Sequence, residues 1–485
     1  MSEVVTKELP KNWAWATFGD VAELLRGINY KKPDASSEPA EGKLPVLRAN
    51  NIGNGLNFNS LVYVPEKLIK QEQVIKKGDI IIAMSSGSKR LVGKAAQATK
   101  DFNGAYGAFC ANLRVTAEIE PKYVAYYYSS QDNLKRISAS SSGSNINNLK
   151  REHILDAPIP VAPLEQQKRI VAKIEELFSH IDAGIEALKK AKQLLKQYRQ
   201  SVLKAAVTGE LTKEWRKANK DKLEPAIQLL ERILKERRRK WEEQQLEQFK
   251  AKGKMPKDIK WKGKYKEPEA IESHKAEVPN GWTICAFEQL ITELKNGISK
   301  KPTEEAGLAI FRISAVRPML VNKDDIRYLQ KDFNSSGFEI EEEDLLFTRY
   351  NGNPELVGVC GKVKGLQRKT VYPDKLMRAR LVNNSSLSSD YLELSLNCGI
   401  SKEFIRSSTK TTAGQSGIAG GDVKKCPVVL PCYIEQQKIA EIVGEKFTAI
   451  EHLSIDLEAQ LVKAEKNKQS ILASVFSGNL SKELI

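Results

Sequence analysis

The sequence is poor in features that mark several classes of protein. Its six cysteines form no CxxC pair, so we expect reduced thiols and neither a disulfide framework nor a zinc site. No apolar run approaches the roughly 18 residues of a membrane-spanning helix. The N-terminal sequence carries charges where a secretory signal needs an apolar run. We therefore expect a cytoplasmic protein.

Catalytic signatures are also missing. There is no GxxxxGK[ST] phosphate loop, and "GNPELVG" at Gly352 lacks the second proline and the aromatic residue of an adenine methyltransferase element. The four histidines, His153, His180, His274 and His452, belong to no nucleophile–base pattern. We expect no catalytic residue, no metal ligand and no cofactor bound by this chain. An unrecognised nuclease site is the alternative.

What the sequence has in excess is positive charge. Lys and Arg number 77 against 61 Asp and Glu, which gives a formal net charge of +16. Such a balance favours an acidic polymer as partner, nucleic acid first. The alternative is a basic protein without such a partner. A length of 485 residues suggests two to four domains.

The sequence contains an internal duplication. Ordered matches run through both halves: "LPKNW" at Leu9 with "VPNGW" at Val278, Gly27-Ile28 with Gly297-Ile298, each soon followed by Lys-Lys-Pro, "EQQK" at Glu165 with "EQQK" at Glu435, and "QSVLKAAVTGEL" at Gln200 with "QSILASVFSGNL" at Gln469. Two copies of one module, about 9–217 and 278–485, follow from these matches.

Each copy has two parts. Short apolar runs broken by Gly, Asn and Pro predict a small mixed α/β globule, and a long helical stretch follows it. The predicted boundaries are 1–160 for the first globule, 161–217 for the first long helix, 218–277 for a charged, Lys-rich connector, 278–430 for the second globule and 431–485 for the second long helix. The connector either touches a surface or phosphates, or is a solvated linker.

Apolar residues in the long helices recur at alternating steps of three and four. The first seam runs from Ile174 to Ala205 with a weak point at Gly184, and the second runs from Val443 to Val475. If the seams pair, the second helix runs antiparallel to the first. The alternative is that each helix packs only on its own globule. We expect both EQQK segments in the first helical turn, with a structural role rather than a catalytic one.

Several polar clusters near predicted strand ends suit the recognition of base edges and phosphates. Arg and Asn side chains can form paired hydrogen bonds with guanine and adenine. The candidate DNA-binding residues are Arg48, Asn50, Asn51, Ser85, Ser86, Ser88, Lys89 and Arg90 in the first copy, and Thr348, Arg349, Tyr350, Asn351, Lys375, Arg378, Arg380, Lys410, Thr411, Thr412, Gln415 and Ser416 in the second.

The whole chain resembles the specificity subunits (HsdS) of type I restriction–modification enzymes, of the type IA kind. The duplicated P-x-x-W start, the EQQK segments, "VLKAAVTGELTKEWR" and the phrases "RANNIGNG" and "LLFTRYNG" carry the resemblance. It implies an internal pseudo-two-fold duplication, with two α/β (α+β) target-recognition domains joined by a pair of long antiparallel coiled-coil helices.

The same resemblance implies a non-catalytic subunit that reads a bipartite, asymmetric site in double-stranded DNA. Two methyltransferase (HsdM) subunits, which use S-adenosylmethionine, and two restriction/translocase (HsdR) subunits, which use ATP and Mg, would be its partners. No membrane is implied. The alternative is a free-standing bivalent DNA-binding regulator without methyltransferase partners.

Overall fold

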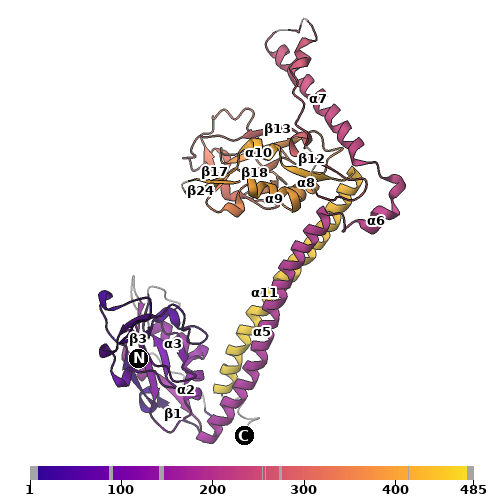
Figure 1. Ribbon diagram of the computed structural model, residues 1–485. Coiled ribbons are helices and arrows are strands. Elements are labelled where there is room, and N and C mark those ends of the chain that lie inside the picture. The colour runs from indigo at the N-terminus through magenta and orange to yellow at the C-terminus, as the bar shows by residue number, and fades with distance from the viewer. Residues whose placement is uncertain are drawn as a thin grey trace. The chain divides into compact units, whose positions relative to one another are not determined.

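The computed structural model describes residues 9–86, 91–140, 147–253, 255–256, 258–271, 276–412 and 414–477. The chain divides into two compact units, one of residues 1–191 and 456–485 and the other of residues 192–455 (Figure 1). Within the described residues, no helix is long and apolar enough to cross a membrane. All six cysteines are buried free thiols, which confirms the prediction of no disulfides.

The first globule is built on a four-stranded antiparallel sheet in the order β2-β9-β5-β7 and a three-stranded sheet in the order β4-β3-β8. Two-stranded ribbons, β1-β11 and β6-β10, complete it. The bounds are β1 Ala14–Thr17, α1 Phe18–Val21, β2 Ala22–Arg26, β3 Lys43–Leu47, β4 Val62–Pro65, β5 Ile80–Ala83, β6 Ser85–Ser86, β7 Ala95–Gln97, β8 Ala105–Tyr106, β9 Cys110–Val115, α2 Pro121–Tyr128, α3 Gln131–Ser140, β10 Asn147–Asn148, α4 Arg151–Leu155, β11 Pro158–Val161 and α5 Leu164–Val207.

The second globule repeats this plan. Its sheets are ordered β13-β22-β18-β20 and β17-β14-β21, beside the ribbon β12-β25 and the small sheets β19-β24-β23 and β15-β16. The bounds are α6 Lys213–Ala218, α7 Ala226–Ala251, β12 Thr283–Ala286, β13 Ile291–Asn296, β14 Leu308–Phe311, β15 Val316–Arg317, β16 Leu320–Val321, β17 Ile326–Leu329, β18 Leu345–Thr348, β19 Tyr350–Asn351, β20 Cys360–Lys362, β21 Thr370–Val371, β22 Leu376–Leu381, α8 Ser389–Leu396, α9 Gly399–Ser408, β23 Lys410–Thr412, β24 Gln415–Gly417, α10 Gly420–Lys424, β25 Pro427–Leu430 and α11 Tyr433–Phe476.

The two apolar runs "DIIIAM" and "EDLLFT" form the central strands β5 and β18. Every residue of both strands is buried, because each sheet is covered on both faces. Ile80 and Ile82 face one core cluster, and Ile81 and Ala83 face a second. An unbroken apolar run is the pattern that such a strand requires, since neither face meets water.

The repeated Gly-Ile pair has a steric cause. A Cβ atom at Gly27 would lie 2.2 Å from the carbonyl oxygen of Gly107, and one at Gly297 would lie 2.2 Å from that of Tyr372. The isoleucine after each glycine forms a parallel bridge, Ile28 to Gly107 and Ile298 to Pro373. Glycine is therefore required in both copies because two backbone segments approach closely.

Each unit contains the start of one long helix and the end of the other. In the first unit, the last turn of α11 packs Leu472, Val475 and Phe476 into the core of the first globule. In the second unit, Val202 and Ala206 at the end of α5 are buried in the core of the second globule. The exchange of helix ends excludes the alternative that each helix packs only on its own globule.

Within each unit the two helices run antiparallel. In the first, the Asp182 carboxylate lies 2.5 Å from Lys468 Nζ. In the second, Tyr198 accepts a hydrogen bond from Lys446 at 3.2 Å, and Arg216 pairs with Glu435. Higher residue numbers in α5 therefore meet lower residue numbers in α11, as the pairing of the seams predicted (Figure 1, magenta α5 and yellow α11).

The seam prediction fails at two positions of α5, Gly184 and Tyr198, the latter being 46% exposed. Gly184 is exposed, and the buried residue at that level of α5 is Ile185, which is 6% exposed. The stripe steps by four residues from Ile181 because a straight α-helix has 3.6 residues per turn and drifts from a strict heptad. In α11, by contrast, the predicted seam positions are all buried or half-buried.

The EQQK segments lie in the first turn of their helices, as predicted, but out of register by one residue. Gln167 of α5 accepts a hydrogen bond from the Glu120 backbone and donates to the Ala162 carbonyl. Gln436 of α11 makes the same two bonds, with Ser388 and Pro431. Gln167 therefore corresponds to Gln436, although the tetrapeptides align it with Gln437. The buried amides have a structural role.

This register places Glu435 where the first copy has Gln166. The Trp13 indole N–H donates to Gln166 Oε1 at 3.1 Å, and the Trp282 indole N–H donates to Glu435 Oε2 at 2.8 Å. Glu435 is 1% exposed, and its other oxygen accepts hydrogen bonds from Thr212 at 2.7 Å and Arg216 at 2.8 Å. In the second unit, a buried carboxylate that accepts hydrogen bonds from three side chains thus replaces the neutral amide of the first unit.

The connector is not a solvated linker throughout. Helix α7 begins on the second globule, where Ala226, Leu229, Leu230 and Ile233 are buried. Its far part carries Trp241, whose ring stacks at 6.1 Å on Trp261 of the returning Lys-rich segment. The two turns of apolar contact make α7 an integral part of the second unit.

Candidate nucleic-acid interface

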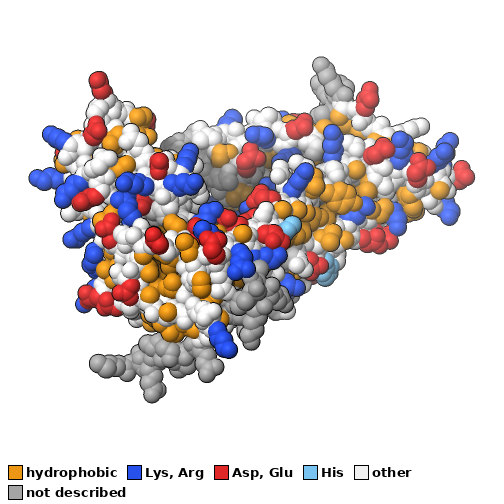
Figure 2. Space-filling model, turned by 90° about the horizontal axis from the view of Figure 1, so that it is seen from below, with side chains coloured by type: hydrophobic (Ala, Val, Ile, Leu, Met, Phe, Trp, Pro, Cys, Tyr) orange, Lys and Arg blue, Asp and Glu red, His pale blue; other side chains and the backbone are white. Residues whose placement is uncertain are grey.

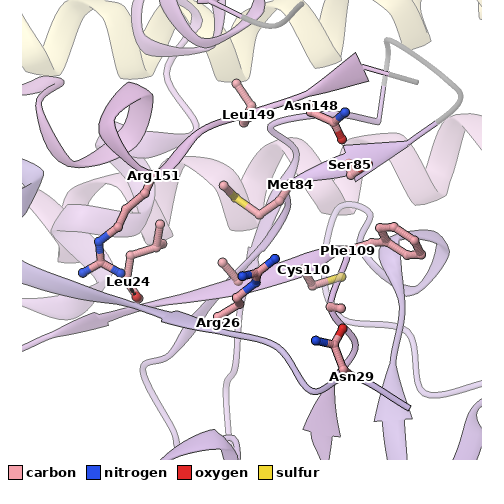
Figure 3. A pocket seen from close by; sticks show the side chains of 12 residues that line it. Leu24, Arg26, Asn29, Met84, Ser85, Phe109, Cys110, Asn148, Leu149 and Arg151 are labelled. Carbon is pink, nitrogen blue, oxygen red and sulfur yellow. Dashed lines mark hydrogen bonds between the residues drawn. The ribbon is translucent and has the colours of Figure 1, made fainter. Parts of the chain in front are cut away.

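A hollow of about 600 Å³ opens in the first globule where β2, β6, β9 and β10 meet (Figure 3). Its polar rim carries the exposed side chains of Arg26, Asn29, Asn148 and Arg151. Ser85 on β6 is paired in register with Asn148 on β10. Arg151 is fixed by donation to the Leu24 carbonyl. The hollow therefore offers two cations, two amides and a hydroxyl to an incoming ligand.

A hollow of about 570 Å³ opens in the second globule. It is lined by the cations Lys300, Lys301, Arg312, Arg317, Arg327 and Lys375, by the polar residues Ser299, Ser314, Tyr350, Asn351 and Gln415, and by the carboxylate of Asp374. Lys300 donates to Gln330 at 3.0 Å, and Arg312 lies 3.4 Å from Asp325. The excess of cations over carboxylates suits a polyanion whose bases also need hydrogen-bond partners.

The hollows occupy related places in the two copies. The Met84 backbone N–H donates to the Phe109 carbonyl at 2.8 Å, and the Arg349 N–H donates to the Lys375 carbonyl at 2.8 Å. Ser85 follows Met84, and Tyr350 follows Arg349. The fold therefore presents Ser85 and Phe109 in one copy where it presents Tyr350 and Lys375 in the other.

Five of the predicted residues line these hollows: Ser85 in the first, and Tyr350, Asn351, Lys375 and Gln415 in the second. Arg349 is half-buried beside them, and its guanidinium lies 4.8 Å from the centre of the Tyr350 ring. The structure thus brings together residues from β19, β24 and the turn before β22 around the second hollow.

Other predicted residues lie outside the hollows or outside the described residues. Arg48, Asn50, Lys410 and Thr411 are exposed, and Arg48 donates to the Ser60 carbonyl at 3.0 Å. Ser86 is half-buried in β6, and Thr412 lies in β23. The remaining predictions, Ser88, Lys89 and Arg90, fall outside the described residues.

Some predicted residues have structural roles instead. Asn51 is 2% exposed, and its amide donates to the carbonyls of Asn57 and Asn59. Thr348 is fully buried and donates to the Leu356 carbonyl. Ser416 is 1% exposed and shares a 2.7 Å hydrogen bond with Thr411. These three side chains are directed into the globules, and the structural role of each replaces the predicted contact to DNA.

The two arginines of β22 are likewise structural. Arg378 is 1% exposed, pairs with Glu293 and donates to the Glu339 carbonyl. Arg380 donates to Asp344 at 3.0 Å, and burial raises the pKa of that carboxyl despite this hydrogen bond. The first copy has the same pair, since Arg114 donates to Asp79 at 2.6 and 2.8 Å. A pair repeated in both copies stabilises the shared fold.

Sequence reasoning missed much of each rim. It did not identify Arg26, Asn29, Phe109, Asn148 and Arg151 in the first copy, or Lys300, Lys301, Arg312, Arg317 and Arg327 in the second. The repeated Gly-Ile and Lys-Lys-Pro pattern was the available signal, because Ile298 to Pro302 line the second hollow. The other residues come from separate strands whose meeting is a property of the fold.

Charge alone does not locate the interface. Figure 2 shows Lys and Arg side chains spread over the drawn face with Asp and Glu among them. Several cations of the chain are paired at helix surfaces, such as Lys189 with Glu186 and Arg239 with Glu236. The two hollows therefore define the candidate interface better than the net charge does.

Comparison with known proteins agrees with this picture. Residues 10–196 match the family described as type I restriction modification DNA specificity domain. The chain is 35% identical over 478 residues to the type I restriction enzyme EcoKI specificity subunit of Escherichia coli K12, covering 98% of this chain and 90% of that protein.

Solved structures share the fold. One, titled as the structural basis of complex assembly and conformational transition of the type I R-M system, aligns over 97% of this chain and 99% of its own with a TM-score of 0.64 and 16% identity. The HsdS subunit from Thermoanaerobacter tengcongensis aligns over 98% and 99% with a TM-score of 0.50 and 15% identity. With its full-length 35% identity to EcoKI's subunit, the chain belongs to the type I restriction enzyme specificity subunits, the non-catalytic DNA-recognition components of these systems.

Proposed function

We propose that each globule reads one half of a bipartite, asymmetric double-stranded DNA site through its hollow. The observation that carries this proposal is the replacement of Ser85 and Phe109 in one copy by Tyr350 and Lys375 in the other, on the same backbone frame. Asn and Arg side chains suit the edges of bases. The exposed Arg48, Asn50, Lys410 and Thr411, together with Ser88, Lys89 and Arg90, extend the proposed contacts to bases or phosphates.

The paired helices α5 and α11 would set the spacer between the half-sites and dock two methyltransferase subunits, with two restriction/translocase subunits completing the enzyme in the cytoplasm. The name of the EcoKI relative, a specificity subunit of a restriction enzyme, supports such an assembly. Exposed apolar residues on the helices support a docking role: in the second unit Leu194 is 54%, Leu453 52% and Ile455 59% exposed.

The test is methylome sequencing of a host that carries this chain with its methyltransferase. Changing Asn351 and Lys375 to Ala should alter one half-site, and changing Arg26 and Asn148 to Ala should alter only the other. Each lost base contact should cost about 1–3 kcal/mol of binding free energy. Equal changes in both half-sites from either pair would contradict the two-reader proposal.

A pull-down separates this function from that of a free-standing regulator. The purified tagged chain should retain methyltransferase in stoichiometric amount through washing at moderate salt. Recovery of sequence-specific DNA binding by the chain without methyltransferase in its host would favour the regulator.

A further inference from the structure

Phe109 is an exposed aromatic side chain on a rigid backbone. Its ring is 66% exposed at the rim of the first hollow. Its carbonyl accepts hydrogen bonds from Met84 at 2.8 Å and Ser85 at 3.2 Å, and the following Cys110 N–H closes a turn onto Gly107 at 2.8 Å. The backbone is therefore fixed while the ring is left in solvent.

The neighbours of Phe109 are polar. Ser85 and Asn29 lie on the same side of the hollow as the ring, and Asn148 lies beyond Ser85 (Figure 3). An isolated exposed apolar residue needs no explanation. An aromatic ring among amides and a hydroxyl, at the mouth of a recognition hollow, matches the mixed surface with which proteins read a base pair.

The second copy supplies an internal comparison. Lys375 occupies the position of Phe109, because both carbonyls accept the N–H of the residue that follows the central strand by one position. Lys375 is also exposed and lines its hollow. The fold therefore exposes this position at the hollow in both copies. The first copy has an apolar ring there, and the second has a cation.

We propose that Phe109 is a specificity-determining residue whose ring contacts the 5-methyl group of a thymine in the half-site read by the first globule. Apolar side chains recognise this methyl in the major groove, and the amides of Asn29 and Asn148 suit the paired adenine. The inference rests on the proposed function and adds to it the class of base that the first hollow accepts.

The experiment is a thermodynamic cycle between the ring and the methyl group, made with the purified complex of this chain and its methyltransferase. Binding is measured for wild type, Phe109→Ala and Phe109→Leu. The duplexes carry the half-site assigned by methylome sequencing, with each thymine replaced singly by deoxyuridine. Because loss of one buried methyl group is worth about 0.8 kcal/mol, wild type should bind one deoxyuridine duplex about fourfold more weakly.

Phe109→Ala should bind the thymine duplex more weakly and show no further loss with that deoxyuridine, whereas Phe109→Leu should keep most of the discrimination. The proposal would be overturned if Phe109→Ala weakened binding to the thymine duplex and to every deoxyuridine duplex by the same factor relative to wild type. A half-site with no thymine in either strand would also overturn it. A failure of the proposed function is distinct, because wild type itself would then select no half-site.

Discussion

At the scale of single residues, the buried carboxylate of Glu393 makes the stability of the second globule depend on pH. Glu393 on α8 is 4% exposed, and its Oε1 accepts the backbone N–H of Lys362 at 2.5 Å. Burial raises its pKa from 4.5 to about 6, although this hydrogen bond opposes the shift. Between about pH 4.5 and 6, the folded protein therefore holds a proton that the unfolded chain has released.

The raised pKa predicts the sign of the effect. Its contribution to stability is fully present below pH 4.5 and is lost as the pH rises through 6. Glu393→Gln keeps the acceptor oxygen and cannot ionise. The variant should match wild type near pH 4.5 and exceed it by about 2 kcal/mol in the free energy of unfolding at pH 7.5. Urea denaturation of the second globule's transition measures this difference.

Glu403→Gln is the matched control, because Glu403 is exposed on the neighbouring helix α9. It should leave the unfolding free energy unchanged at both pH values. A Glu393→Gln variant that is less stable than wild type at pH 7.5 would mean that the nearby lysines outweigh burial at this site.

The residues also show where sequence reasoning ends. Both Thr348 and Arg378 were predicted to contact DNA, and Thr348 is the last residue of β18 whereas Arg378 lies within β22. The sequence pattern placed Thr348 close to a strand end. It did not reveal that both side chains face inward, because the partner of Arg378 is Glu293, 85 residues away. Side-chain direction in a short, bulged or edge strand depends on partners that only the folded chain assembles.

At the scale of elements, the EQQK repeat illustrates a related limit. Four identical residues marked both helix starts correctly, yet the buried hydrogen bonds match Gln167 with Gln436. Glu435 could replace Gln166 because Arg216 from beyond α5 neutralises its charge. The helix lengths, their antiparallel pairing and the duplication were predictable since each rests on many residues, whereas register rests on a few bonds.

Helix α7 gives the prediction for this scale. If α7 is part of the second globule, removing its buried side chains should destabilise that globule. Leu229 is fully buried, so Leu229→Ala should lower the free energy of unfolding by about 2–5 kcal/mol. Ile227, on the same turn, is 51% exposed and serves as the control.

Ile227→Ala should change the free energy of unfolding by less than about 0.5 kcal/mol. Equilibrium unfolding in urea compares the two variants with wild type. Equal, small effects of both substitutions would show that α7 is a detachable linker in solution.

At the scale of the whole molecule, the proposed spacer role of α5 and α11 can be separated from base reading. In the second unit, Tyr198 of α5 contacts Lys446 of α11. Lys192 lies six residues before Tyr198 in α5, and His452 lies six residues after Lys446 in α11. Because the helices are antiparallel, these two positions lie at about the same level of the pair. Four residues inserted after both positions keep the contacts on either side in register.

The double insertion adds about 6 Å of helical rise and a surplus rotation of about 40°. If the pair is the ruler, the spacer between the half-sites should lengthen by about one to two base pairs, since ten base pairs span about 34 Å. Both half-site sequences should stay the same, because the hollows are untouched. Methylome sequencing of the variant beside wild type measures the spacer and the half-sites together.

The insertion in α5 alone is the matched control. It shifts the seam against α11 and breaks contacts such as that of Asp182 with Lys468 or that of Tyr198 with Lys446, so methylation should fall along with stability. Active methylation with an unchanged spacer in the double insertion would refute the ruler. Altered half-site letters with a longer spacer would assign the helices a part in reading bases, because nothing else in either globule has been changed.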